Sequence, residues 1–491
     1  MMQMRTHTCN ALRLADVGKS VKIVGWMENV REVGGNLAFV VLRDFYGTTQ
    51  VVVEDEADLK VIKSLNKEST ISVEGTVRER ASKNSKLPTG EIEVVPTKIE
   101  VLGRCRYNAL PFEINRSREA DETQRLKYRY LDLRNPAVKN NIILRCNVVA
   151  AIRKAMMDAA ADPQNWKYSL RDLPELLDAV CGYYKRRFGV EITPDQVASC
   201  AGSQEGVGHI GMVLCDEGDT VLLPTPCYPV FIAGSLLGGA KPWYYPLTKE
   251  HGFLPYVKDI PEDVARKAKY MIVSLPANPV GSVGSPDLYA ELVAFAKKYD
   301  ILIIHDNAYS DIIFDGAVGN SFFNTPGAMD VGVEFFSLSK SFNVTGARIS
   351  FLVGRRDVVA AFKKLRGQID FGMFLPVQKA AIAALTGPLD MVKTQCGLYQ
   401  QRRDALCGGL RSIGWNVPDS HGSMFVWAPI PAKYAKSMDF CLDLVEKSGV
   451  LCTPGSSFGP LGEGYVRFAL TLPPERIAEA VQSIKASGIL N

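Results

Sequence analysis

Two patterns of hydrophobic and polar positions divide the chain. In residues 1–103, short stretches either alternate apolar with polar residues or run with β-branched ones, and Gly, Asn and Asp bound them. These stretches are VKIVGWMENV, LAFVVLRDFYG, TQVVVED, STISVEGTVRER and GEIEVVPTKIEVLG, with one helical pattern, ADLKVIKSLN. Such patterns are typical of β-strands between turns. Five strands and one helix predict an all-β closed barrel of the OB-fold kind.

The pattern changes after a polar, basic segment. Residues 104–145, which include NRSREADETQRLKYRYLDLRNP, indicate a linker. Beyond it, helical patterns such as LPELLDAVCGYYKRRF alternate with short apolar runs such as DTVLLP, YMIVSLP and DILIIHD. Alternating helices and buried strands predict an α/β fold with a mostly parallel sheet.

Composition limits the class of protein. The 491 residues are enough for two to four domains, and 47% of them are hydrophobic against 22% charged. No apolar run reaches the roughly 18 residues of a membrane span. The N-terminus MMQMRTHTCNALRL lacks the apolar centre of a secretion signal. Eleven scattered cysteines without a CxxC pair indicate reduced thiols and no structural zinc. We therefore expect a cytoplasmic protein with no membrane partner and no metal site.

The positive charge is concentrated in the first part of the chain. Residues 1–150 hold 24 Lys and Arg against 19 Asp and Glu, which leaves 33 against 34 in the rest. This excess is compatible with an anionic partner for the first part alone. A mildly basic surface without any partner is an equally good explanation.

Candidate chemistry lies where predicted strands end, the edge at which open α/β sheets bind ligands. The turn AGSQEGVGHIGMVL opens a predicted helix whose free N–H groups, with Ser203 and Gln204, could hold an anion. Other residues at strand ends are Tyr228 in PTPCYPVF, Asn278 in PANPVG, and Asp306 and Tyr309 in HDNAYSD. Taken alone, each has an ordinary structural explanation as a cap, a turn former or a packed side chain.

One later segment places unlike groups close together. SLSKSFNVTGAR contains Ser337, Ser339, Lys340 and Arg348, and YVRFAL carries Arg467 in a predicted strand. Hydroxyls and a guanidinium suit a phosphate, whereas a lysine amine suits an aldehyde. The order of these residues therefore favours a site for a molecule that has both groups.

The motifs NWKYSLRDLPELLDAV, GSQEGVGH, PTPCYPVF, PANPVGS, HDNAYSDI, SLSKSFNVTGARISFLVG and YVRFAL occur in the order found in one enzyme family. In this part the chain resembles class I/II aminotransferases of pyridoxal-phosphate (PLP) fold type I, in the LL-diaminopimelate aminotransferase-like branch. The resemblance implies a large PLP-binding domain, with a mostly parallel sheet covered by helices on both faces, and a small C-terminal α+β domain. It implies amino-group transfer between an α-amino acid and a 2-oxo acid. A PLP-dependent carbon–sulfur β-lyase shares nearly all these motifs and remains an alternative.

The same resemblance implies roles for the candidate residues. Lys340 would form the Schiff base with PLP and move the proton at the substrate's Cα. Asp306 would keep the pyridine nitrogen protonated, and with Lys340 and Tyr309 it makes up the implied catalytic set. Arg467 would pair with the substrate carboxylate, and Asn278 would also contact the substrate. Tyr309 and Asn278 would bond the 3-oxygen of the ring. The remaining implied cofactor contacts are Tyr228 on the ring face and Gly202, Ser203, Gln204, Ser337, Ser339 and Arg348 near the phosphate.

The chain departs from this family at its front. An N-terminal arm and a glycine-containing loop normally precede NWKYSL, whereas only IRKAMMDAAADPQNW stands there. This departure makes PLP binding a firmer expectation than turnover. Tyr168, in NWKYSL, matches a tyrosine that contacts the phosphate of the neighbouring subunit, so the resemblance implies a homodimer.

Residues 1 to about 150 resemble a different family, the bacterial-type aspartyl-tRNA synthetases. The matching motifs, in order, are MRTHTCNALRLADVGKSVKIVGWMENVRE, FVVLRDFYGTTQVVV, GTVRER, LPTGEIEV and RLKYRYLDLRNP. The OB-fold of that family binds the tRNA anticodon, and the catalytic motifs that normally follow are absent from this sequence. Phe39 would stack on a base and Gln50 would read a base edge. Further candidates on the same face are Arg31, Arg78, Arg80, Asn84 and Glu93.

The two resemblances predict four segments: an OB-fold domain at 1–103, a hinge-like linker at 104–150, a large PLP-binding domain at 151–385 and a small domain at 386–491. The join could be a fusion without an evolved joint function or a tRNA-linked transaminase. The rival to an enzyme is a tRNA-binding synthetase fragment attached to an inactive aminotransferase part.

Overall fold

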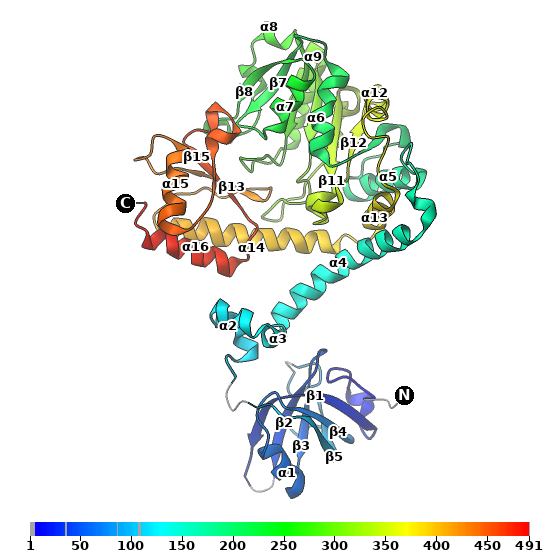
Figure 1. Cartoon of the computed structure of the whole chain (residues 1–491), viewed down its shortest axis with the longest axis vertical. Helices are drawn as coiled ribbons and strands as arrows, with labels where there is room; N and C mark the ends of the chain where they lie inside the picture. Colours follow the sequence, from blue (N-terminus) through cyan, green and yellow to red (C-terminus); the bar gives the residue numbers. More distant parts are fainter. Residues whose placement is uncertain (1–4, 35–36, 86, 107–109, 491) are drawn as a thin grey trace. The chain divides into compact units, whose positions relative to one another are not determined.

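The computed structural model of the chain describes residues 5–34, 37–85, 87–106 and 110–490 (Figure 1). The side chains of 122, 126, 137 and 139–150 are not part of this description. The chain divides into two compact units, Met1–Ile143 and Leu144–Asn491, which are described separately as the N-terminal and the C-terminal unit.

The N-terminal unit contains a closed barrel with the strand order β1-β2-β3-β5-β4. Alternate residues of β1, such as Val21 and Ile23, are buried in its core, as the period of a strand requires. Asp55 caps α1 by accepting hydrogen bonds from the N–H groups of Ala57 and Asp58. The predicted OB-type barrel is thus confirmed. Its elements are β1 (Ser20–Glu32), β2 (Ala38–Arg43), β3 (Thr48–Val53), α1 (Glu56–Lys63), β4 (Thr70–Glu79) and β5 (Ile92–Gly103).

The segment predicted as a linker contains helices. They are α2 (Glu122–Lys127), α3 (Arg129–Asp132) and α4 (Pro136–Ala161). Asp132 is fully buried and accepts a hydrogen bond of 2.7 Å from the Ser117 hydroxyl, and Asn135 donates to the Ile114 carbonyl over 3.0 Å. The polar residues that suggested a linker therefore satisfy one another inside a folded segment.

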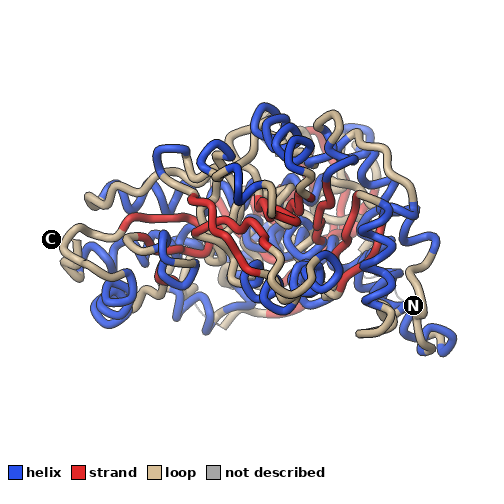
Figure 2. The backbone as a smooth tube through the Cα atoms, turned by 90° about the horizontal axis from the view of Figure 1, so that it is seen from above, coloured by secondary structure: helices blue, strands red, loops and turns tan. Residues whose placement is uncertain are grey.

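The C-terminal unit is built on a seven-stranded sheet with the order β6-β12-β11-β10-β9-β7-β8. Only β12 runs antiparallel to its neighbours β11 and β6, so the sheet is mostly parallel, as predicted. Helices lie on both sides of these strands (Figure 2). The strands are β6 (Val197–Cys200), β7 (Thr220–Thr225), β8 (Lys241–Pro246), β9 (Ala268–Ser274), β10 (Leu302–Asp306), β11 (Gly332–Ser337) and β12 (Ser350–Gly354).

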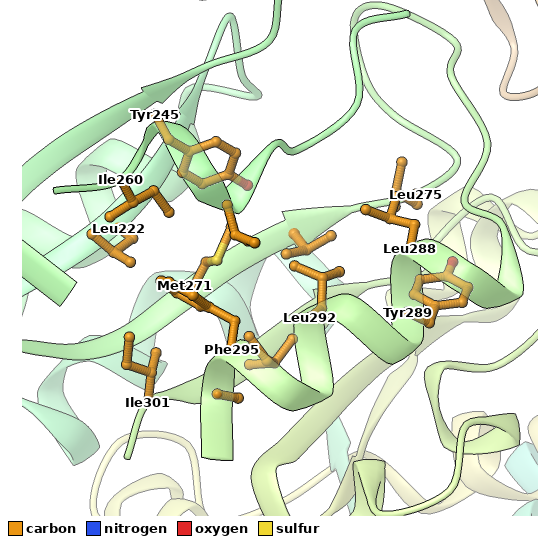
Figure 3. Close-up of a cluster of buried hydrophobic side chains, with 14 of the residues drawn as sticks. Leu222, Tyr245, Ile260, Met271, Leu275, Leu288, Tyr289, Leu292, Phe295 and Ile301 are labelled. Carbon is orange, nitrogen blue, oxygen red and sulfur yellow. The ribbon is translucent and has the colours of Figure 1, made fainter. Parts of the chain in front are cut away.

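Each face of this sheet has its own apolar core. Leu222 and Met271 pack against α9 on one face (Figure 3), whereas Leu223 and Ile272 belong to the cluster that includes residues of α6, α7 and α12. Adjacent strand residues point to opposite faces, which is why each run is apolar throughout. The helices are α5 (Pro174–Phe188), α6 (Ser203–Leu214), α7 (Val230–Leu237), α8 (Glu262–Ala265), α9 (Pro286–Tyr299), α10 (Ala328–Val331), α11 (Leu338–Ser341), α12 (Arg356–Arg366) and α13 (Leu375–Thr386).

A smaller α+β part completes the C-terminal unit, and it too was predicted. Its three-stranded sheet has the order β13-β15-β14, and the long helix α14 leads into it. Among the helices of the described ranges, none is long and apolar enough to cross a bilayer. The elements are α14 (Asp390–Ser412), β13 (Phe425–Pro429), α15 (Ser437–Ser448), β14 (Thr453–Pro454), β15 (Tyr465–Ala469) and α16 (Pro474–Ala486).

Candidate active site

Lys340 lies on the single helical turn α11, directly after β11. Ser337 caps this turn by accepting a hydrogen bond of 3.2 Å from the N–H of Ser339. Burial lowers the pKa of the Lys340 amine, the positive charges of Arg348 and Arg467 lower it further, and Asp306 opposes them. Three other predicted site residues, Asp306, Arg348 and Arg467, therefore act electrostatically on Lys340.

Asp306 is the last residue of β10 and is almost completely buried. Its Oδ2 accepts a hydrogen bond of 3.4 Å from the Ser274 hydroxyl, whereas Oδ1 is buried without a hydrogen-bond partner. Burial raises the pKa of this carboxyl to about 6, against the lowering effects of His305 and the Ala308 N–H. A buried acceptor without a donor fits a protonated ring nitrogen.

Four further predicted residues contact members of this group or one another. The Lys340 ammonium lies 5.9 Å from the centre of the Tyr309 ring, and burial followed by Asp306 raises the pKa of the Tyr309 hydroxyl. Tyr309 therefore remains a neutral hydrogen-bond donor. Asn278 accepts a hydrogen bond from Arg467, and the Tyr228 hydroxyl donates to Oε1 of Gln204 over 3.1 Å.

The N-terminus of α6 and the guanidinium of Arg348 form a site suited to an anion. Gly202 precedes Ser203, the first residue of this 12-residue helix, and no side chain caps it. Arg348 donates hydrogen bonds to the carbonyls of Thr345, at 3.0 Å, and Ala201, at 3.3 Å. A Cβ on Gly202 would collide with the Arg348 guanidinium. Free helix N–H groups beside a guanidinium are well suited to a phosphate.

Arg467 lies on β15, opposite Thr453 of β14. It donates to Oδ1 of Asn278 over 2.9 Å and to the Thr453 hydroxyl over 3.4 Å, while its Nε is buried without a partner. Its guanidinium carbon lies 4.1 Å from the centre of the Phe425 ring and 4.6 Å from that of Phe458. The planar group is thus fixed by aromatic faces, with donor capacity left for a carboxylate.

Tyr168 is the predicted residue that stands apart. Its side chain is 81% exposed, and its described ring contact is with Phe371, at 5.5 Å between ring centres. An exposed position is what a residue that reaches into a neighbouring subunit requires.

Sequence reasoning missed several residues that support this site. Ser274 bonds Asp306, Thr453 bonds Arg467, and His305, the residue before Asp306, pairs with Glu334 at full burial. For Glu334 a signal existed, because a glutamate within the apolar run GVEFFS needs a buried partner.

The seven predicted nucleic-acid-binding residues line one cavity of about 660 Å³ on the barrel. The Arg31 guanidinium lies 5.1 Å from the centre of the Phe39 ring, and both groups are at least partly exposed. Glu93 accepts hydrogen bonds from Gln50 Nε2, at 2.9 Å, and from Arg78 Nε, at 3.1 Å. Arg80 donates from Nε to the Ile92 carbonyl over 2.9 Å. Asn84 and the other members complete the lining of this cavity.

Comparison with known proteins agrees with both parts. The family described as "Aminotransferase class I and II" matches residues 140–484, and "OB-fold nucleic acid binding domain" matches residues 21–102. An LL-diaminopimelate aminotransferase of Halothermothrix orenii is 44% identical over 336 residues, which cover 68% of this chain and 86% of the relative. One from Moorella thermoacetica is 42% identical over 328 residues, or 66% of this chain and 84% of the relative.

Solved structures resemble the C-terminal unit. Apo-BacF from Bacillus subtilis is 34% identical, with a TM-score of 0.67, and the match covers 68% of this chain and 90% of that one. A probable N-succinyldiaminopimelate aminotransferase from Thermus thermophilus is 31% identical, with a TM-score of 0.65. This match covers 68% of this chain and 90% of that one. The chain therefore belongs to the class I and II aminotransferases, which are pyridoxal-phosphate-dependent transaminases, and it carries an OB-fold domain at its N-terminal end.

Proposed function

We propose that the C-terminal unit transfers an amino group between an α-amino acid and a 2-oxo acid, with Lys340 as the central catalytic residue. The observation that carries this proposal is the convergence on Lys340 of one carboxylate, Asp306, and two guanidinium groups, Arg348 and Arg467. A half-buried lysine near two cations has a reason to be neutral, and a neutral amine is a nucleophile and a base.

Each end of pyridoxal phosphate has residues that fit it. The α6 N-terminus and Arg348 would hold the phosphate, and the unpartnered Oδ1 of Asp306 would accept a hydrogen bond from the ring nitrogen. Tyr309 and Asn278 would bond the 3-oxygen, and Tyr228 would cover the ring. When bound, the cofactor supplies an electron sink for the substrate's α-carbon.

The chain itself supplies binding and proton movement. Arg467 would hold the substrate's α-carboxylate, because its half-buried guanidinium lies beside Asn278 and keeps an Nε without a partner. Lys340 Nζ would then take the proton from the substrate's α-carbon, since its pKa lies below the usual value of a lysine. Tyr309 keeps its proton and remains a donor throughout.

A spectroscopic experiment tests the role of Lys340. Purified protein mixed with pyridoxal phosphate should gain a visible absorption band that borohydride fixes covalently to the chain. Lys340→Ala should lose this covalent attachment, whereas Lys364→Ala, at an exposed position on α12, should keep it. A wild-type protein that remains colourless with the cofactor would contradict the proposal.

The names of the relatives indicate which substrate to assay first. Two relatives more than 40% identical are LL-diaminopimelate aminotransferases, so a diamino dicarboxylic acid is the first amino donor to assay, with 2-oxoglutarate as acceptor. Strict dependence of product formation on the 2-oxo acid supports a transaminase. Product released from an S-substituted cysteine without any 2-oxo acid would favour the carbon–sulfur β-lyase instead.

We also propose a homodimer with shared sites, supported by the 81% exposure of Tyr168 in a motif near the start of the predicted PLP-binding domain. Tyr168→Phe and Lys340→Ala place their defects on different parts of the chain. If Tyr168 serves the neighbouring site, mixing the two variants should yield hybrid dimers with one site that carries both defects and one that carries neither. A monomer in sedimentation at assay concentration would contradict this proposal.

For the N-terminal unit we propose binding of single-stranded RNA of the tRNA anticodon type. The family match names a nucleic-acid-binding domain, and the seven residues line a single cavity with an arginine, Arg31, over the ring of Phe39. Aromatic faces and basic groups on an OB-fold are what unpaired bases and phosphates need.

Fluorescence anisotropy with an aspartate-type anticodon stem–loop RNA tests this proposal. Phe39→Ala should weaken binding by about 5- to 150-fold, because stacking of one base contributes about 1–3 kcal/mol. Tyr46→Ala is the matched control, since Tyr46 is a 54% exposed aromatic residue outside the cavity lining. Equal affinity of the wild type and Phe39→Ala would remove the proposal.

A further inference from the structure

His305 and Glu334 form a buried pair behind the candidate active site. They are register partners on the parallel strands β10 and β11, and both side chains are fully buried. Nδ1 of His305 lies 2.8 Å from Oε2 of Glu334. Neither residue belongs to the groups that would touch cofactor or substrate, so their role is not explained by the site described above.

Glu334 is surrounded by hydrogen-bond donors. Besides His305, it accepts from the Tyr184 hydroxyl at 2.7 Å, the Ser321 hydroxyl at 2.9 Å and the Phe322 N–H at 2.8 Å. Burial alone would raise the pKa of this carboxyl, but His305 and these hydrogen bonds outweigh burial and lower the pKa. Glu334 is therefore an ionised carboxylate with both oxygens occupied.

The second nitrogen of His305 also faces an acceptor. Nε2 lies 3.1 Å from the carbonyl oxygen of Leu275, which has no proton to give, and 3.4 Å from the Tyr289 hydroxyl of α9, which can act in either sense. Figure 3 shows Leu275 and Tyr289 in the same apolar cluster. A hydrogen on each ring nitrogen would satisfy the Glu334 carboxylate and the Leu275 carbonyl together, and an imidazole with both hydrogens is a cation that pairs with Glu334.

The residue after His305 in the strand is a buried carboxylate, whose ionised form a nearby positive charge would stabilise. Asp306 follows His305 directly in β10, and burial strongly disfavours its ionised form. Of the influences that oppose burial, His305 is the largest, ahead of the Ala308 N–H, the Ser274 hydroxyl and Lys340. Glu334 lies on the neighbouring strand β11, where it is the register partner of His305, whereas the register partner of Asp306 is Phe335.

We propose that His305 and Glu334 are a positioning pair that holds a fixed positive charge behind Asp306 and keeps its carboxylate ionised toward the ring nitrogen of the cofactor. This inference rests on the proposed role of Asp306. Glu334 makes the buried cation tolerable, and the cation in turn makes the buried anion of Asp306 available at neutral pH.

The test uses the full-length protein loaded with pyridoxal phosphate that carries ¹⁵N in its ring, and it compares His305→Gln and Glu334→Gln with Tyr184→Phe. The first two variants remove a charge of the pair, whereas the third removes one hydrogen bond to Glu334 and no charge. Two quantities are measured: the pH at which cofactor affinity falls as Asp306 is protonated, and the ¹⁵N shift of the ring nitrogen.

In the wild type, affinity should fall as the pH drops through about 6, where Asp306 takes up a proton. In His305→Gln and Glu334→Gln this midpoint should rise by about one unit, which makes cofactor binding about tenfold weaker between the two midpoints. The ring-nitrogen shift should also move toward that of an unprotonated pyridine. Tyr184→Phe should leave both quantities close to the wild type.

A folded His305→Gln that binds the cofactor with an unchanged midpoint and an unchanged ¹⁵N shift would overturn this inference alone. A wild type that binds no cofactor would remove the proposed function and this inference together. If the charge variants do not fold, ¹⁵N-histidine spectra of the wild type decide the matter. A buried imidazole with both nitrogens protonated at pH 7.5 supports the pair, and one with a single protonated nitrogen refutes it.

Discussion

Nη1 of Arg467 donates a hydrogen bond of 2.9 Å to Oδ1 of Asn278, across 189 residues of the chain. The bond links strand β15 of the small sheet to the loop that follows β9 of the large sheet. The guanidinium of Arg467 also contacts the rings of Phe425 and Phe458. A substrate carboxylate would therefore meet a guanidinium whose orientation is already fixed, which lowers the entropy cost of binding.

Arg467→Lys should lower kcat/KM for the amino acid by about 10- to 100-fold, because one charge-assisted hydrogen bond contributes about 1.5–3 kcal/mol. Lysine keeps the charge but cannot offer two parallel donors or stack on the two rings. Steady-state kinetics with both the amino acid and the 2-oxo acid measure this effect. Arg411→Lys, at an exposed ion pair with Asp419, is the control. Unchanged kinetics in Arg467→Lys would place the carboxylate elsewhere.

Asp306→Asn should stabilise the cofactor-free protein while it abolishes transamination. Burial raises the pKa of Asp306 from 3.8 to about 6 in the folded state, so the folded state binds the extra proton. The contribution of Asp306 to the free energy of unfolding is therefore fully present below the pKa of this carboxyl in the unfolded state. It is lost as the pH rises through the pKa of the folded state. Above about pH 6, asparagine avoids that loss, which is at most about 3 kcal/mol for this shift.

Urea denaturation of the cofactor-free protein at pH 4.5 and pH 8 checks the sign. The advantage of Asp306→Asn should be larger at pH 8 than at pH 4.5. Asp330→Asn, which replaces an exposed carboxylate, should show no comparable gain at pH 8. An advantage that is larger at pH 4.5 would mean that the Asp306 carboxylate is stabilised in the folded state, contrary to its burial.

Gly202→Ala should weaken cofactor binding through the phosphate. Gly202 has φ +87°, a backbone conformation that costs an alanine about 1–3 kcal/mol, and its Cβ would displace the Arg348 guanidinium. Gly208→Ala is a matched control within the same helix, because its Cβ would meet only Val230, at 4.0 Å, and alanine favours a helix. Equilibrium dialysis with pyridoxal phosphate should therefore show a loss for Gly202→Ala and little change for Gly208→Ala.

Local sequence predicted the elements and much of the candidate site because both depend on short segments. Alternation in residues 21–30 and the apolar run before Asp306 marked β1 and β10 directly. The short segment from Ser337 to Arg348 could be identified because it is local. Ser337 and Arg348, expected at the phosphate, are eleven residues apart, and Lys340, expected at the aldehyde, lies between them. Its meaning came from the order of the motifs rather than from any single residue.

The supporting contacts could not be predicted because they join distant segments. His305 meets Glu334 only because β10 and β11 are neighbours in register, and no local pattern states which strands pair. The helices between residues 104 and 145 were missed for a related reason. Asp132 and Asn135 belong to a polar stretch that indicated a solvent-exposed linker. In the structure they are buried, where Asp132 bonds Ser117 and Asn135 bonds the Ile114 carbonyl.

Glu93→Gln should reduce base discrimination on the barrel more than it reduces affinity. Glu93 is 5% exposed and orients both Gln50 and Arg78, so its loss frees the amide expected to read a base edge, while the cavity becomes less negative. A well-placed pair of hydrogen bonds contributes about 1–3 kcal/mol of discrimination.

Fluorescence anisotropy measures the affinity for the anticodon stem–loop and for a copy altered at its middle base. Glu93→Gln should lower the ratio of these two affinities about tenfold, which is within the range for one lost base contact. Glu54→Gln is the matched control, because exposed Glu54 also pairs with Arg78, at 3.0 Å, and the same charge is removed. Gln50 donates to Glu93 and not to Glu54 among its described contacts, so only Glu93→Gln should change the ratio. If Glu54→Gln lowers the ratio equally, the effect is one of net charge, and Gln50 does not read the base.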